Sequence, residues 1–286
     1  MAMIQVNGVE LAVETFGSAA DPAILLVHGA SASMLCWETE LCARIANRGR
    51  FVIRYDNRDT GLSVSYPPGR PGYSLADLAA DAIGVLDALG VARAHLVGRS
   101  MAGAIVTYAA LAWPERADSL TLVTTTSGSP DLPPMSEEFL AYVASPKPDP
   151  GDRAAVVEYI VGLLRAYSGD SPYFDERTVR AFVEEDVART RDIEACLTNH
   201  FVMKFDAPPG GLGDLRVPTL VVHGEQDPVF PLPHGQALRD AIPGAELLVL
   251  EKAGHEVPAP LWEVFADALT SGPSTSDTAA RQGLDH

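Results

Sequence analysis

The chain has 286 residues, of which 47% are hydrophobic and 21% are charged, and its formal net charge at pH 7 is −17. This length and hydrophobic content favour a large buried core, and one large α/β domain, or one domain that carries an insertion, over two independent units. The negative charge argues against nucleic acid and anionic membranes as partners, because no basic cluster compensates it.

Nothing at the N-terminus indicates export. The opening "MAMIQVNGVELAVETFG" lacks the basic and apolar regions of a signal peptide, and no apolar run reaches the roughly 20 residues of a membrane span. The cysteines Cys36, Cys42 and Cys196 lack metal-ligand spacing and are expected to be buried, reduced thiols. A cytoplasmic protein is therefore predicted, and monomer and homodimer both remain open.

Apolar strands alternate with helical patterns in the first part of the chain. The dipeptide Asn7-Gly8 predicts a hairpin, and the continuous apolar run before Gly29 predicts a strand buried on both faces. The predicted strands are residues 4–6, 9–16, 23–29, 51–56, 94–98 and 118–126. The predicted helices are residues 35–49, 74–90 and the segment after Ser100. This alternation predicts a mostly parallel sheet covered by helices.

The alternation stops near residue 127 and resumes near residue 217. Helical patterns such as "DRAAVVEYIVGLLRAY" and "DERTVRAFVEEDVARTRDIEACL" fill the interval, and a strand–helix–strand–helix order comes after it. We therefore expect a helical cap over the carboxyl edge of the sheet. The predicted organisation is a core at 1–126 and 216–270, a cap at 127–215 and a flexible tail at 271–286.

Ser100 lies between a predicted strand and a predicted helix, in the segment "VGRSMAG". A tight strand-to-helix turn of this kind holds a nucleophile clear of the backbone and requires small neighbours. Gly98 supplies one of them, whereas Ala102 stands where the pattern usually has glycine. We expect some crowding at Ala102 but a preserved turn. A serine that only caps a helix is the alternative.

An aspartate and a histidine lie after two later strands. Asp227 comes after the strand in "VVHGEQDPVF", and His255 comes after the last strand, in "EKAGHEVP". Taken separately they are a turn residue and a surface histidine. The order Ser100, Asp227, His255 at three strand ends instead predicts a catalytic triad, because the carboxyl ends of parallel strands converge.

The segment "VHGAS" ends the strand at 23–27 in a turn of small residues, so its amides can face the nucleophile. We expect the backbone N–H groups of Ala30 and Met101 to form an oxyanion hole. Trp37, Tyr159 and Phe201 are candidates for lining a substrate pocket, although the core is the more usual place for side chains of these types. A phosphate-binding glycine pattern, a Walker lysine and metal-ligand histidine spacing are absent, so no metal ion or cofactor is implied.

With Ser100, Asp227, His255 and the "HGA" turn at these positions, the sequence resembles members of the α/β-hydrolase family. The resemblance covers residues 3–126 and 217–269 and implies an eight-stranded, mostly parallel sheet with a helical cap inserted after strand 6. The stretch "VIRYDNRDTGLS" is also similar to family members. It implies structural hydrogen bonds for Asp56, Arg58 and Ser63.

Within the family, the core segments resemble methylesterases that act on anthracycline polyketides. The resemblance implies a serine hydrolase that cleaves carboxylic esters, with a methyl ester of a hydrophobic or polyketide substrate as the specific version. A lactone or C–C bond hydrolase with the same triad is one alternative, and a non-hydrolytic protein that binds or cyclises a ligand is another. Arg99, beside the nucleophile, is expected to point away from the pocket.

Overall fold

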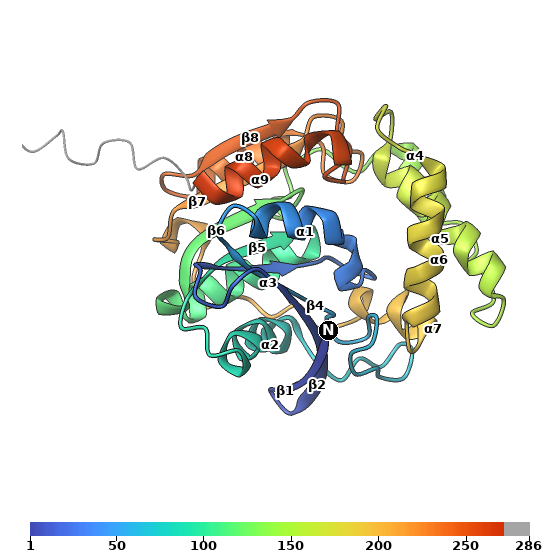
Figure 1. Cartoon of the computed structure of the whole chain (residues 1–286). Helices are drawn as coiled ribbons and strands as arrows, with labels where there is room; N and C mark the ends of the chain where they lie inside the picture. The colour runs from blue at the N-terminus through green and yellow to red at the C-terminus, as the bar shows by residue number, and fades with distance from the viewer. Residues whose placement is uncertain (272–286) are drawn as a thin grey trace, which may run out of the picture.

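The computed structural model describes residues 1–271. Its centre is one eight-stranded sheet in the order β1-β2-β4-β3-β5-β6-β7-β8 (Figure 1). The strands are β1 (Ala2–Val6), β2 (Val9–Phe16), β3 (Ala23–Val27), β4 (Phe51–Tyr55), β5 (Ala94–Arg99), β6 (Ala117–Val123), β7 (Thr219–Gly224) and β8 (Glu246–Leu250). Strand β2 runs antiparallel to both β1 and β4, and the other neighbouring strands pair in parallel, so the predicted mostly parallel sheet is confirmed.

The β1–β2 hairpin turns at the predicted dipeptide. Asn7 and Gly8 have φ angles of 45° and 76°, which is the left-handed conformation that a two-residue hairpin turn requires. The proposed tail at 271–286 lies outside the described residues except for Ser271, which is the last residue of a helix, α9.

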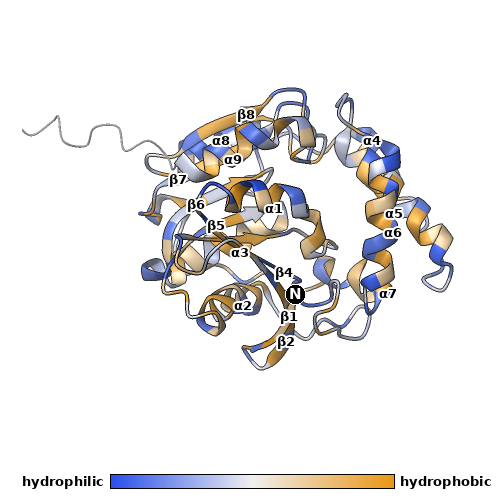
Figure 2. Cartoon of the chain, in the orientation of Figure 1, coloured by the Kyte–Doolittle hydropathy of each residue, from blue (hydrophilic) through white to orange (hydrophobic). Residues whose placement is uncertain are grey.

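Helices cover the two faces of the sheet. Figure 2 shows hydrophobic residues, in orange, where the strands lie between these helices. Residues of α2 (Leu75–Ala88), α3 (Met101–Ala112) and α8 (Pro233–Ala241) pack in one hydrophobic cluster, and residues of α1 (Thr39–Ala46) and α9 (Trp262–Ser271) pack in a second. Strand β3 contributes alternate residues to the two clusters, because successive side chains of a strand point to opposite faces. A strand buried on both faces must therefore be apolar throughout.

The helix expected at residues 35–49 is shorter than predicted. A 3₁₀ turn at Met34–Cys36 precedes it, and α1 begins only at Thr39. The cause is a buried cation from the sheet: Arg54 on β4 donates a hydrogen bond to the carbonyl oxygen of Trp37, which turns that peptide out of a helical path.

Four helices lie between β6 and β7 in the chain, and they stand to one side of the sheet (Figure 1). They are α4 (Glu137–Val143), α5 (Arg153–Ser168), α6 (Glu176–Arg189) and α7 (Ile193–Cys196). The helical pattern at 175–197 is split in two, because Asp192 accepts a hydrogen bond from the Ala195 N–H and begins α7. Helices α5 and α6 pack through Val157, Val161 and Val183. We call residues 127–215 the cap.

The strand order places two loops together at the edge that the cap faces. After β3 the chain adds β4 on one side, and it then crosses back to add β5 on the other side. The turns after β3 and β5 therefore emerge next to each other, and open α/β sheets bind ligands at such a crossover.

Candidate active site

Ser100 lies on a strained turn between β5 and α3. Its φ and ψ angles are 55° and −125°, outside the common regions for a residue with a side chain. The neighbouring strand holds the turn: the Ser100 N–H donates to the Val123 carbonyl at 2.9 Å, and the Thr125 hydroxyl donates to the Ser100 carbonyl at 2.7 Å. With both backbone groups bonded to the sheet edge, the Ser100 hydroxyl projects from it.

The close approach at this turn falls at Gly98, not at Ala102. A Cβ atom on Gly98 would lie 2.3 Å from the Ala102 carbonyl oxygen and 2.5 Å from a Val106 methyl carbon. A Cβ atom on Gly103 would lie 2.5 Å from the Thr125 hydroxyl. The Ala102 methyl group is instead buried among hydrophobic residues of the core. Gly98 and Gly103, and not Ala102, are thus the crowded positions of this turn.

This geometry predicts opposite results for two single-methyl changes. Gly98→Ala should destabilise the fold by about 1–3 kcal/mol and reduce activity, because the start of α3 must move away from β5. Ala102→Gly should cost only about 0.5–1 kcal/mol of helix stability and leave activity nearly unchanged. Urea unfolding and initial rates of both variants are the measurement. Equal losses in the two variants would contradict the assignment of the contact to Gly98.

His255 connects Ser100 to Asp227. The His255 Nε2 atom lies 3.0 Å from the Ser100 hydroxyl oxygen, and the His255 Nδ1 atom lies 2.8 Å from Asp227 Oδ2. The second oxygen, Oδ1, accepts hydrogen bonds from the backbone N–H groups of Val229 and Phe230 at 2.8 and 2.9 Å. The sequence thus brings a hydroxyl, an imidazole and a carboxylate from three strand ends into one hydrogen-bonded series.

The carboxylate of this series is held in its ionised form. Burial by itself would raise the pKa of Asp227, but the charge and hydrogen bond of His255, with contributions from His223 and the Phe230 N–H, lower the pKa below its ordinary value. An ionised Asp227 accepts from His255 Nδ1–H and leaves Nε2 free to accept a proton.

The cap completes the surroundings of His255. The Tyr167 carbonyl at the end of α5 accepts a hydrogen bond from the His255 N–H at 2.9 Å, and the Tyr167 ring lies 5.2 Å from the imidazole between ring centres. Phe230 also packs edge-on against the imidazole, at 5.6 Å between ring centres. A Cβ atom on Gly254 would lie 2.6 Å from the Tyr167 carbonyl oxygen, so this contact also requires a glycine before the histidine.

The turn after β3 lies against the serine. A Cβ atom on Gly29 would lie 2.9 Å from the Ser100 Cβ atom and 3.4 Å from the Met101 nitrogen. Among residues 1–271 the Ala30 N–H has no acceptor, and Met101 is the first residue of α3, so its N–H lacks an intrahelical acceptor. Within residues 1–271 both N–H groups therefore lack an acceptor, and the oxyanion hole stays a prediction.

Two expectations about neighbouring side chains are wrong. Trp37 does not line the pocket: it is 1% exposed and stacks on Phe265 of α9, at 6.0 Å between ring centres. Arg99 does not point away: it lines the same cavity as Ser100, and its Nη2 atom donates to the His255 carbonyl at 2.7 Å. Arg99 lies two residues after Val97 on β5, so both side chains leave the same face, and that face leads to the His255 loop.

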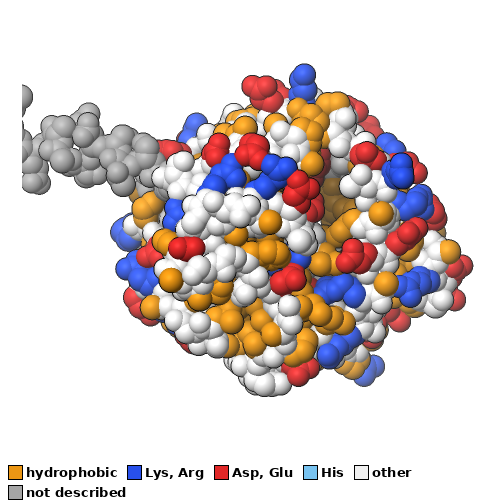
Figure 3. Space-filling view, viewed as in Figure 1, with side chains coloured by type: hydrophobic (Ala, Val, Ile, Leu, Met, Phe, Trp, Pro, Cys, Tyr) orange, Lys and Arg blue, Asp and Glu red, His pale blue; other side chains and the backbone are white. Residues whose placement is uncertain are grey.

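A cavity of about 1570 Å³ opens between the sheet edge and the cap. The face shown in Figure 3 is hollowed there, with hydrophobic side chains in the hollow. Two of the predicted pocket residues, Tyr159 on α5 and Phe201, line it, and Phe201 is 63% exposed. The aromatic lining also includes Phe139, Tyr167, Tyr173, Phe174, Phe182 and Phe230. Ser100, His255 and Arg99 lie on its floor.

One acidic side chain of the cavity has a strongly perturbed pKa. Burial raises the pKa of Glu38 to about 7, although Arg99 and Arg54 act in the opposite direction. The unfolded chain ionises near pH 4.5, so the protonated side chain favours the fold fully below that pH, and this advantage is lost as the pH rises through 7. Glu38→Gln should therefore stabilise the protein more at pH 8 than at pH 5.

Urea unfolding of the Glu38→Gln variant at the two pH values is the measurement. Glu115, an exposed residue, provides the matched control, because Glu115→Gln should have the same small effect at both pH values. A gain from Glu38→Gln that does not change with pH would contradict a raised pKa in the folded state.

Several residues of the site were not identified from the sequence. Gly29 and Gly254 have a signal in retrospect, since each adjoins a predicted site residue in a turn. The contacts of Tyr167 depend on where the cap lies, and no local sequence pattern predicts them. In the described part of the chain, no group of three histidine, cysteine or acidic side chains could hold a metal ion. Within residues 1–271, no helix combines the length and apolar character of a membrane span.

The sheet order, the cap after β6 and the serine turn after β5 together define an α/β hydrolase. The sequence matches the profile described as "Alpha/beta hydrolase family" over residues 24–268. The chain therefore belongs to the α/β-hydrolase family.

Relatives of known activity support this membership. The chain is 32% identical over 285 residues to rhodomycin D methylesterase DauP of Streptomyces sp. strain C5, which covers 93% of this chain and 96% of that protein. It is 30% identical over 239 residues to the 2-hydroxy-6-oxononadienedioate/2-hydroxy-6-oxononatrienedioate hydrolase of Burkholderia vietnamiensis, which covers 82% and 80%. The first of these relatives agrees with the resemblance of residues 54–61, 77–98 and 217–235 to aclacinomycin methylesterase.

Solved structures show the same fold. The enol-lactonase from Burkholderia xenovorans LB400 superposes with a TM-score of 0.74 over 94% of this chain and 98% of that chain, at 22% sequence identity.

Proposed function

We propose that the protein is a serine hydrolase that cleaves carboxylic esters through an acyl-serine intermediate on Ser100. The observation that carries this proposal is the continuous series from the Ser100 hydroxyl through His255 to the buried Asp227, at 3.0 and 2.8 Å. It lies on the floor of a cavity, beside two free backbone N–H groups. A serine that only caps a helix has no need for these partners.

Acylation begins when the Ser100 oxygen attacks the ester carbonyl carbon. His255 Nε2 takes the hydroxyl proton, and Asp227 stabilises the imidazolium that results. The carbonyl oxygen becomes an oxyanion and accepts hydrogen bonds from the Ala30 and Met101 N–H groups, which strengthen as the charge develops. The C–O bond of the ester then breaks, and His255 returns the proton to the leaving alkoxide, which departs as the alcohol.

Deacylation repeats these steps with water. His255 Nε2 takes a proton from a water molecule, and the water oxygen attacks the carbonyl carbon of the acyl group bound to Ser100. The second tetrahedral intermediate collapses, the proton passes to the Ser100 oxygen, and the carboxylic acid leaves. His255 relays the proton in both halves of the cycle, and water supplies the proton and the hydroxyl group that the two products gain.

We infer that the substrate is a small molecule, a methyl ester of a hydrophobic, multi-ring compound such as a polyketide. The cavity of about 1570 Å³ exceeds the roughly 300–1,000 Å³ of typical small-molecule pockets, and aromatic side chains form much of its wall. The similarity to rhodomycin D methylesterase supports the methyl ester, which places a small leaving group at Ser100 and the bulk of the acyl part in the cavity.

The test is product analysis on a panel of substrates of one size: aromatic polycyclic methyl esters, the corresponding lactones, and vinylogous diketones that report C–C cleavage. We expect methanol and the free acid from the methyl esters at the highest kcat/KM. Faster turnover of the lactones or diketones would overturn the ester assignment. No turnover of any compound by a protein that still binds the esters would favour a ligand-binding protein.

A further inference from the structure

The segment that begins at the Ala30 N–H is bound by the cap. We call residues 29–34 the oxyanion turn. The Ser31 N–H donates to Nδ1 of His200 at 3.1 Å, and the Ser31 hydroxyl donates to the Cys196 carbonyl at 2.7 Å. Burial lowers the pKa of His200 to about 4, so its ring is neutral and Nδ1 can accept this hydrogen bond. Both partners come from the end of the cap.

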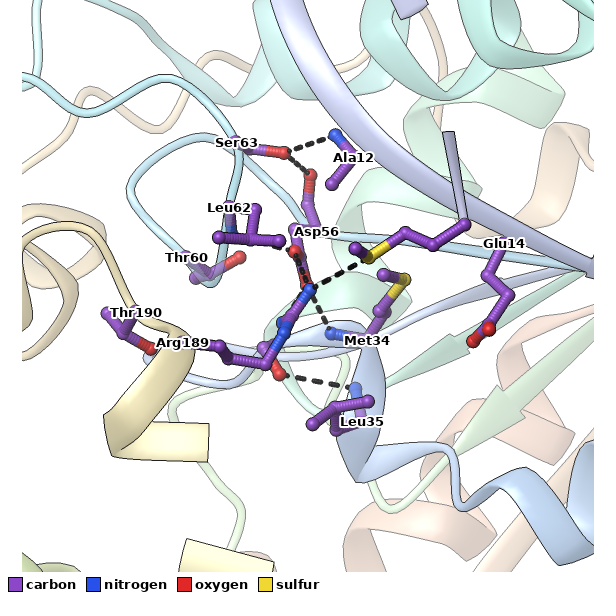
Figure 4. Close-up of polar contacts among 12 residues, drawn as sticks. Ala12, Glu14, Met34, Leu35, Asp56, Thr60, Leu62, Ser63, Arg189 and Thr190 are labelled. Carbon is purple, nitrogen blue, oxygen red and sulfur yellow. Dashed lines mark hydrogen bonds and ion pairs between the residues drawn. The ribbon is translucent and has the colours of Figure 1, made fainter. Parts of the chain in front are cut away.

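Asp56, at the end of β4, holds the other end of the turn. Its Oδ1 atom accepts from the Met34 N–H at 2.8 Å, and its Oδ2 atom accepts from the Leu62 N–H at 2.9 Å. The side chain of Asp56 is fully buried. Its only cationic partner in residues 1–271 is Arg189, the last residue of α6, whose Nη1 and Nη2 atoms reach the two oxygens at 3.1 and 2.8 Å (Figure 4).

Helix α6 makes a second contact one turn earlier. The Ser33 hydroxyl donates a hydrogen bond to the carboxylate of Asp186. The Oδ1 atom of Asp186 lies 3.9 Å from the Nη1 atom of Arg189. Residues three apart lie on the same face of a helix, so one face of α6 carries both groups toward the oxyanion turn. The cap therefore contacts the turn through a charged pair as well as through Cys196 and His200.

From this arrangement we infer that Arg189 is a positioning residue for ester hydrolysis: through Asp56 it couples the docked cap to the placement of the Ala30 N–H. This inference rests on the proposed function. Arg189 lines no part of the main cavity and does not touch Ser100 or His255. It acts on the substrate oxygen only through Asp56, Met34 and the turn.

The physical reason is the cost of a buried charge. Without Arg189, the Asp56 carboxylate has no cation beside it and bears the full cost of a buried charge unless it moves toward water. Such a shift weakens the acceptor that holds the Met34 N–H and frees the turn to move. A preorganised donor stabilises the oxyanion less when it is displaced. Removing one oxyanion donor altogether costs on the order of 10²–10³ in kcat, which sets the upper limit of the effect.

The experiment compares three variants of α6 in the full-length protein. Arg189→Gln removes the charge, Arg189→Lys retains it, and Arg180→Gln is the matched control. Arg180 lies on the same helix and pairs with Glu158 and Glu176 within the cap, away from the turn. For each variant we would measure kcat and KM on a methyl ester, and the inhibition constant of a trifluoromethyl ketone, whose tetrahedral adduct places an oxyanion in the hole.

For Arg189→Gln we expect kcat to fall about tenfold and the inhibition constant to rise by about the same factor, with KM within about twofold, since only a fraction of one donor's effect is lost. Arg189→Lys should recover most of kcat, and Arg180→Gln should match wild type. An unchanged kcat for Arg189→Gln, or a rise in KM alone, would overturn the inference.

A second variant tests the same coupling if Arg189→Gln does not fold. Asp186→Asn keeps the side-chain volume and leaves the Arg189–Asp56 pair in place, but it weakens the bond to Ser33. It should lower kcat without changing KM, and no fall in kcat would count against the coupling. The proposed function is tested separately. If the wild-type protein forms no covalent adduct with a fluorophosphonate, the assignment as a serine hydrolase is wrong. If the wild-type protein is labelled and these variants keep full activity, only the coupling through Arg189 is wrong.

Discussion

Replacing Ser100 with alanine is expected to reduce ester hydrolysis by on the order of 10⁴- to 10⁶-fold, because it removes the atom that forms the acyl intermediate. The fold should survive, since the backbone bonds that hold the turn, from Ser100 N–H to Val123 and from Thr125 to the Ser100 carbonyl, do not involve the hydroxyl. Intact mass after treatment with a fluorophosphonate is the measurement. Wild type should gain one adduct, and Ser100→Ala should gain none.

Two further proteins make this result specific. His255→Ala keeps the nucleophile but removes its base, so labelling should also vanish on the same time scale. Ser129→Ala, an exposed serine at the start of the cap, should label like wild type. An adduct that persists in Ser100→Ala would show that another side chain is the nucleophile.

Replacing Asp227 with asparagine is expected to lower kcat by on the order of 10⁴-fold while the fold is largely preserved. The orientation of the new amide is set by its neighbours. The Val229 and Phe230 N–H groups bind Oδ1, so the asparagine oxygen must remain there and its NH₂ group must replace Oδ2. That NH₂ group faces His255 Nδ1 and forces the tautomer in which Nε2 carries the proton, so the imidazole cannot accept a proton from Ser100.

The measurement is kcat on a methyl ester, with thermal unfolding of the same sample as a check on folding. Asp240→Asn is the matched control, because Asp240 lies on α8 and its ion pair within residues 1–271 is with exposed Arg239. A variant Asp227→Asn that retains kcat within tenfold of wild type would show that the carboxylate does not orient the imidazole. A cooperative unfolding transition near that of wild type is expected, since asparagine has almost the same volume.

The cap contributes more to this site than a wall for the substrate. Tyr167 holds the backbone of His255, and Cys196, His200 and Arg189 hold the oxyanion turn directly or through Asp56. Asp56 was expected to form only structural hydrogen bonds, and it does form them with Met34 and Leu62. Its ion pair with the cap connects this structural role to the placement of the turn.

Local sequence patterns determined the fold and the candidates for the triad. An apolar run that ends in glycine predicts a strand buried on both faces, and the ends of parallel strands meet at one edge whatever the lengths of the connecting segments. Ser100, Asp227 and His255 could therefore be placed near one another from the sequence, and Gly98 could be recognised as the small residue of the turn.

Contacts between distant segments were decided only by the tertiary structure. Asp56 and Arg189 are 133 residues apart, and nothing near either residue specifies the other. Trp37 is excluded from the cavity because Arg54 fixes its backbone and Phe265 covers its ring, and Arg99 enters the cavity because the His255 loop offers it a carbonyl oxygen. The physical reason is common to these cases: a side chain's partner depends on which surfaces pack together, and periodicity along the chain records only which face is buried.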